Sequence, residues 1–93
     1  MANSPSGDFG LGVVFVPLTK DWVATIDSED APLVLPYKWC ALEQAPTRVY
    51  AVRGVGRKLV YMHRGLCQTP SGLSVYHING DGLDNRRSNI RVC

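Results

Sequence analysis

Residues 74–93, SVYHINGDGLDNRRSNIRVC, give the strongest indication of how this chain folds. The segment opens with an alternating run of side chains that reaches His77, a pattern typical of a strand. Residues 79–82 (NGDG) then supply the residue types that favour tight turns, and residues 89–93 begin a second strand. We therefore predict two strands joined across a polar loop.

The polar side chains of this loop suggest chemistry on phosphate. His77 ends the first strand, and Asn89 lies where the second begins, so strand pairing would bring them together. Imidazole is a good general base near neutral pH, and an Asn amide can join two loop ends because it both donates and accepts. Arg86, Arg87 and Arg91 could supply the positive charge that a phosphate needs. We predict His77 and Asn89 as catalytic residues; the alternative is a histidine that only holds the loop.

The same stretch resembles the core of the HNH endonucleases, specifically the phage and intron-encoded homing type. The family pattern runs roughly Asp-His-x-Asp/Asn-Gly-Asn/Asp-x-x-Asn-Asn-Arg-x-x-Asn-Leu-Arg. The positions in register with it are His77, Asn79, Gly80, Asp81, Asn85, Arg86, Asn89 and Arg91. Upstream, VYMHRGL resembles the strand that precedes this core. Residues 16–58 resemble a small sheet-plus-helix unit, similar in style to plant ethylene-response DNA-binding domains.

The resemblance implies a ββα-metal motif, in which two strands and a helix hold one divalent cation, Mg²⁺ or Mn²⁺. It implies that His77 deprotonates the water that attacks a phosphodiester of double-stranded DNA, and that Asn89 orients the loop of this histidine. The implied protein is a metal-dependent DNA endonuclease of a mobile element or phage. We expect it to be intracellular, in the cytoplasm of a bacterial or phage-infected host, with no membrane partner.

Two departures from the family pattern bear on this expectation. Tyr76 stands where the family has an acidic metal ligand, and a phenol is a poor ligand for a hard cation. Asp81 is a candidate to replace that acid, whereas Asp84 and Asn85 read as a turn cap. The residue that completes the family's metal site lies on a helix beyond Cys93. We therefore expect a core truncated before its C-terminal helix, with its two strands uncovered, and more stable when extended.

Basic residues upstream are further candidates for contacts with DNA. Arg64 belongs to the His-Arg pair that precedes the core, while Arg53, Arg57 and Lys58 flank a predicted turn. The alternatives are a solvated turn for these three residues and an inward-packed His63. Trp and Tyr side chains are expected in the core rather than as platforms for bases.

The fold class that follows is α+β, with a small N-terminal β-sheet unit and a short helix followed by the incomplete ββα-metal motif. We expect a flexible lead over 1–12, a β-rich DNA-binding unit over 13–66 and the HNH core over 67–93. Within the middle unit the sequence predicts a hairpin, a short helix after residue 28, and strands over 38–43, 49–55 and 57–64. These three strands are predicted because β-branched and aromatic residues alternate in them.

Charge is distributed unevenly along the chain. Residues 1–43 carry two basic and six acidic side chains, whereas residues 44–93 carry eight basic and two acidic ones. This asymmetry favours a polyanion as partner of the C-terminal half.

The three widely spaced cysteines form no Cys-x-x-Cys pair, so we expect reduced thiols rather than disulfides or a zinc site. Two alternatives stay open: a DNA-binding module without cleavage, and a structural domain without a nucleic-acid role.

Overall fold

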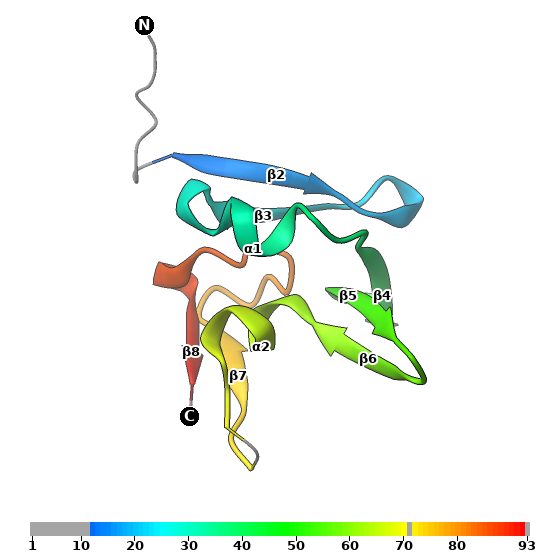
Figure 1. Ribbon diagram of the computed structural model, residues 1–93. Helices are drawn as coiled ribbons and strands as arrows, with labels where there is room; N and C mark the ends of the chain where they lie inside the picture. Colours follow the sequence, from blue (N-terminus) through cyan, green and yellow to red (C-terminus); the bar gives the residue numbers. More distant parts are fainter. Residues whose placement is uncertain (1–11, 71, 93) are drawn as a thin grey trace, which may run out of the picture.

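A computed structural model describes residues 12–70 and 72–92, so the expected flexible lead lies, apart from Gly12, outside the described residues. These residues form three antiparallel sheets and a few short helices (Figure 1). The strands are β2 (Val13–Pro17), β3 (Val23–Asp27), β4 (Cys40–Ala45), β5 (Arg48–Val55), β6 (Lys58–Tyr61), β7 (Val75–His77) and β8 (Ile90–Val92). The helices are η1 (Thr19–Asp21), η2 (Ser28–Asp30), α1 (Ala31–Val34), α2 (Met62–Cys67) and η3 (Arg87–Asn89). The predicted α+β class is confirmed.

Strand pairing follows the sequence pattern closely. β2 pairs with β3, β4 with β5 and β6, and β7 with β8, always antiparallel. In the last pair His77 lies opposite Ile90 and Tyr76 opposite Arg91. The hairpin, the short helix and the two closing strands were all predicted, while the ββα-metal motif as a whole stays a prediction.

The strand predicted over 57–64 is wrong in its second half. β6 ends at Tyr61, and α2 begins at Met62. Met62, His63 and Leu66 are all buried, and a helix can turn these three positions inward together, whereas a strand would send Met62 and His63 to opposite faces. Gln68 ends the helix in the left-handed region (φ 49°), and its N–H is donated to the carbonyls of the last turn.

The helix α2 packs against β5, β7 and β8. The expectation that β7 and β8 would lack a covering helix is therefore wrong, because a preceding segment supplies one. Figure 1 shows α2 beside both strands. Ile90 of β8 is buried with Met62 and Leu66 in one hydrophobic cluster.

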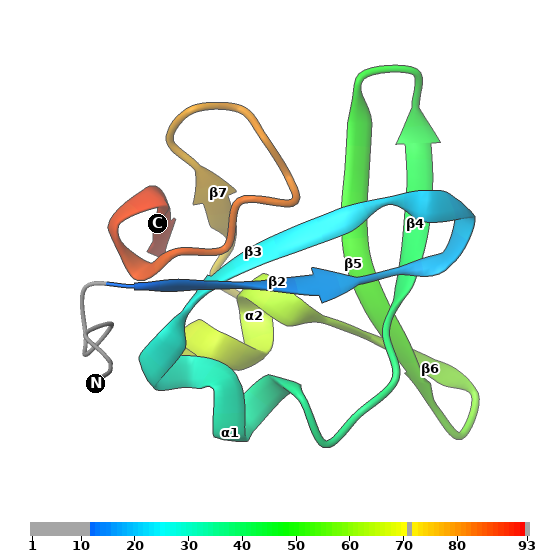
Figure 2. The same ribbon diagram turned by 90° about the horizontal axis from the view of Figure 1, so that it is seen from above.

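That cluster includes side chains from both sides of residue 66, the boundary predicted between the two functional units. Its members are Val16, Ala24, Ile26, Val34, Trp39, Val49, Ala51, Met62, Leu66, Leu83 and Ile90. The loop between β7 and β8 also pairs with β3, because a parallel bridge joins Thr25 to Asp84. The Thr25 N–H is donated to the Leu83 carbonyl at 2.8 Å, and the Asn85 N–H to the Thr25 carbonyl at 2.7 Å. Figure 2 shows this loop lying against the β2–β3 hairpin.

Candidate active site

His77 lies at the end of β7 with one nitrogen fixed by a buried amide. Its Nε2 is 2.8 Å from Oδ1 of Asn85, whose side chain is fully buried. The Nδ2–H group of Asn85 donates a hydrogen bond to the Met62 sulfur at 3.3 Å, so Oδ1 faces the imidazole. Because an amide oxygen only accepts, the neutral imidazole carries its proton on Nε2 and its lone pair on Nδ1.

Asn85 is thus the partner of His77 that sequence reasoning missed. The sequence places it in register with the family pattern, but we interpreted it as part of a turn cap. A polar residue directly before the basic pair gives no sign of burial by itself. Asn85 contacts Met62 of α2, a residue that the sequence pattern placed in a strand.

Asn89 joins the two ends of the loop rather than contacting the imidazole. Its Oδ1 accepts the Asn79 N–H at 3.1 Å, while its Nδ2 is donated to Asn79 Oδ1 and to the Asp84 carbonyl, both at 2.9 Å. The Asn79 amide in turn reaches the Asp84 carboxylate at 3.0 Å. This is the loop-bridging arrangement expected of Asn89; its part in catalysis stays a prediction.

The acidic side chains near His77 are already engaged within the loop. Asp81 Oδ1 accepts the Leu83 N–H at 2.9 Å. Asp84 accepts two hydrogen bonds of 2.7 Å from Arg86, and these lower the pKa of its carboxyl. Tyr76 is about half exposed on β7.

The expected divalent cation stays a prediction. Within residues 12–70 and 72–92, no three His, Cys, Asp or Glu side chains converge on a possible metal position. The predicted ligand Asp81 accepts the Leu83 N–H, and Asp84 is paired with Arg86. His63 and Cys67, which lie four residues apart on α2, likewise belong to no such group of three among the described residues.

A second histidine packs against His77. The ring centroids of His63 and His77 are 4.8 Å apart, and Tyr50 lies 5.5 Å from the first and 5.9 Å from the second. His63 is 6% exposed, and its buried Nδ1 has no hydrogen-bond partner among residues 12–70 and 72–92. Burial above all, then His77 and Arg64, lowers the pKa of His63 to about 4. His63 is therefore an uncharged wall of the site, as the inward-packed alternative expected.

A cavity of about 250 Å³ opens beside His77. Its lining comes from β5, β7 and the loop, and consists of Arg48, Tyr50, Val75, Tyr76, His77, Gly80 and Gly82. Arg48 is exposed and is the cation of this cavity. Sequence reasoning missed it, because only the packing of β5 against the loop brings residue 48 to residue 77.

Two of the predicted DNA contacts are paired internally. Arg87 forms two hydrogen bonds of 2.9 Å with Asp30, and its backbone N–H is donated to Asp27 at 2.9 Å. Arg86 grips Asp84 as described. Both arginines therefore hold the fold together, and their side chains are only half exposed.

The remaining predicted contacts divide between engaged and open side chains. Arg64 donates to the Leu73 carbonyl at 3.1 Å, and Arg53 lies 3.8 Å above the ring of Tyr37. By contrast, the side chains of three exposed residues make no hydrogen bond or ion pair within the described part of the chain; they are Arg57, Lys58 and Arg91.

Comparison with models of protein families, with curated proteins and with solved structures found no match. Among the described residues, no helix is long and apolar enough to cross a membrane.

Proposed function

We propose that this protein hydrolyses phosphodiester bonds of double-stranded DNA as an HNH-type endonuclease, with His77 as general base. The observation that carries the proposal is the hydrogen bond between His77 and Asn85, which assigns the imidazole proton to Nε2, beside a cavity that both His77 and Arg48 line. A base needs a fixed tautomer, and this hydrogen bond supports the one in which Nδ1 carries the lone pair.

The following step assigns roles to groups of this chain. His77 Nδ1 takes a proton from water, the water oxygen bonds to phosphorus, the bond from phosphorus to the 3′ oxygen breaks, and the 3′ oxygen takes a proton from solvent. Asn85 Oδ1 continues to accept from Nε2–H and so stabilises the imidazolium that forms. Arg48 supplies positive charge to the phosphate oxygens. Mg²⁺ or Mn²⁺ belongs to the proposal through the family resemblance, and no residue is assigned to it.

The test is nicking of supercoiled plasmid in Mg²⁺, Mn²⁺ or a chelator. We expect His77→Ala to abolish nicking and Asn85→Ala to reduce it by roughly ten- to a hundredfold, because an unfixed imidazole samples the wrong tautomer. Arg48→Gln should weaken cleavage, whereas Arg57→Gln, which changes an exposed arginine remote from the cavity lining, should change it little. Wild-type cleavage by His77→Ala would remove His77 as the base.

A specific observation favours a second function, DNA binding without cleavage. Tyr76 replaces the family's acid, and the described residues contain no metal-ligating cluster. Tyr76→Asp would add a carboxylate to the cavity that contains His77. If the wild-type protein retains DNA without nicking it and Tyr76→Asp gains Mg²⁺-dependent nicking, the binding function is correct for the natural chain. Absence of DNA retention at low salt would exclude both functions and favour a structural domain.

A further inference from the structure

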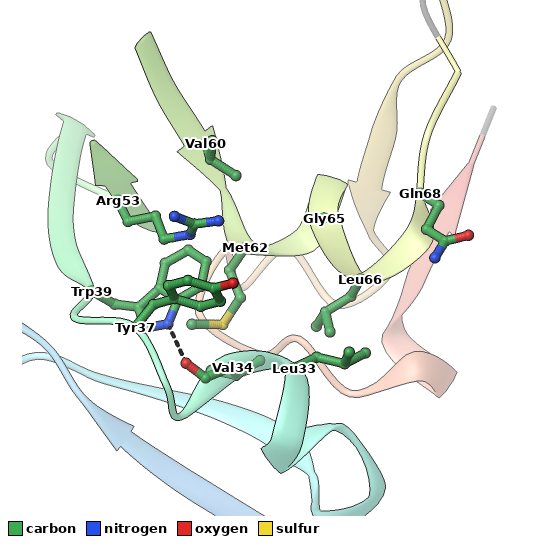
Figure 3. A pocket seen from close by; sticks show the side chains of 10 residues that line it. All are labelled: Leu33, Val34, Tyr37, Trp39, Arg53, Val60, Met62, Gly65, Leu66 and Gln68. Carbon is green, nitrogen blue, oxygen red and sulfur yellow. Dashed lines mark hydrogen bonds between the residues drawn. The ribbon is translucent and has the colours of Figure 1, made fainter. Parts of the chain in front are cut away.

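A second cavity, of about 220 Å³, opens between α1, α2 and the β5–β6 strands (Figure 3). It shares no lining residue with the cavity beside His77. Its inner wall consists of Val34, Met62 and Leu66, which are at most 5% exposed and belong to the hydrophobic core. The wall is therefore apolar and held in place by the packing of the whole domain.

Trp39 and Tyr37 form the aromatic side of this cavity. The Trp39 Nε1–H is donated to the Val34 carbonyl at 2.9 Å, which fixes the indole against α1. Figure 3 shows both rings beneath the side chain of Arg53. The guanidinium carbon lies 3.8 Å from the centre of the Tyr37 ring and 5.6 Å from that of Trp39. The two rings hold the cation at a set position over an apolar pocket.

Arg53 is the charged side chain of the lining, and it has unused donors. Its Nε is buried and has no hydrogen-bond partner within the described part of the chain. Stacking satisfies the faces of a guanidinium, whereas its N–H groups lie in the plane and need acceptors there. Among the described residues the buried Nε–H lacks an acceptor, and the terminal nitrogens of the guanidinium are not among the buried unpaired atoms, so an anion in the cavity can pair with the charge at its edge.

We propose that this cavity binds a small organic monocarboxylate with a compact apolar body. The carboxylate accepts from the edge of the Arg53 guanidinium, and the body packs against Val34, Met62 and Leu66. A phosphate fits less well, because a single cation beside apolar walls cannot offset the desolvation of a doubly charged group. The volume, below the roughly 300 Å³ of common drug-sized sites, sets the size at about one ring. This site is independent of the proposed nuclease.

Titration of the protein with benzoate, followed by its two-dimensional amide NMR spectrum, tests the site. We expect saturable shifts at Val34, Gly65 and Leu66. Benzyl alcohol, which lacks the charge, and acetate, which lacks the ring, should each bind at least about tenfold more weakly, since each removes one of the two interactions. N-acetylphenylalanine separates the sources of the carboxylate: tighter binding than benzoate indicates a peptide end, and weaker binding a free acid.

Arg53→Met should weaken benzoate binding at least about tenfold, because Met keeps the stacked bulk and removes the donors. Arg57→Met is the matched control, since the same change in the exposed turn should leave binding unaltered. If Arg53→Met does not fold, Leu33→Trp serves as the second variant. Leu33 is an exposed residue of the lining, so the larger side chain should block the cavity without disturbing the core. Equal binding of benzoate and benzyl alcohol, unchanged binding by Arg53→Met, or no saturation with any probe up to about 10 mM would each overturn the proposal.

Discussion

At the scale of single residues, two buried side chains control the chemistry of His77. Asn85 fixes its tautomer through Nε2, and His63 lines the ring on another side without a charge of its own. The sequence predicted that His77 ends a strand beside the loop and that Asn89 joins the two ends of the loop, because residue types and spacing carry that information. It could not predict Asn85 and Arg48, whose positions depend on burial and on contacts between distant strands.

The buried His63 should make the fold sensitive to mild acid. In the unfolded chain a histidine binds its proton near the ordinary pKa of 6.5, whereas in the folded protein the pKa of His63 is about 4. The unfolded state therefore binds more protons between these values, and stability falls as pH falls. From about pH 7 to about pH 5 we expect a loss of about 2 kcal/mol from this group.

Urea denaturation of the wild-type protein and His63→Phe at both pH values measures this contribution. Phe keeps a ring against Tyr50 and cannot be protonated, so its loss of stability over the same interval should be smaller by that amount. Equal pH dependence of the two proteins would show that His63 is not the group responsible.

At the scale of elements, the loop that carries the site is fitted against β5 through a glycine. A Cβ at Gly82 would collide with the Val49 carbonyl and would lie 2.8 Å from two ring atoms of Tyr50. Strand alternation predicted β5 and β7, but nothing in the sequence predicts this close approach. For a similar reason the start of α2 was placed in a strand: residues 62–64 fit a strand locally, and only the shared core selects the helix.

Gly82→Ala should destabilise the protein by about 1–3 kcal/mol, because the backbone carbonyl of Val49 cannot turn aside as a flexible side chain would. Gly54→Ala is the matched control, since a Cβ there meets nothing within 4 Å and Gly54 has no positive φ. Its free energy of unfolding should change by less than about 1 kcal/mol. Thermal or urea denaturation measures the stability of both variants. Equal stability of Gly82→Ala and Gly54→Ala would show that the loop moves away from β5 freely.

At the scale of the whole molecule, the uneven charge of the chain is partly cancelled within the fold. Asp30 and Asp27 from the acidic first half bind Arg87 from the basic second half. The sequence predicted a polyanion-facing C-terminal half, but it could not show which cations are left for a partner. The structure leaves Arg48, Arg57, Lys58 and Arg91 exposed.

Arg87→Gln should therefore affect stability, whereas Arg48→Gln should affect DNA binding. Arg87→Gln leaves the Asp30 side chain, which is 8% exposed, without its cation, and should cost roughly 2 kcal/mol of stability. If the proposed function is correct, Arg48→Gln should leave stability unchanged and reduce the slope of log K for DNA against log salt by about 0.9. Denaturation curves and DNA-binding titrations at several salt concentrations test both, and a stability loss confined to Arg48→Gln would contradict the assignment.

The parallel bridge between Thr25 and Asp84 also has a consequence in time. The edge of β3 is made early in synthesis, whereas the loop that needs it leaves the ribosome 59 residues later. At about 5–20 residues per second, that interval lasts roughly 3–12 s. The hairpin of β2 and β3 waits through this interval with its Thr25 N–H and carbonyl without the partners from the later loop, and the groups around His77 come together only as β7 and β8 emerge. The candidate active site therefore forms only after both β7 and β8 have been synthesised.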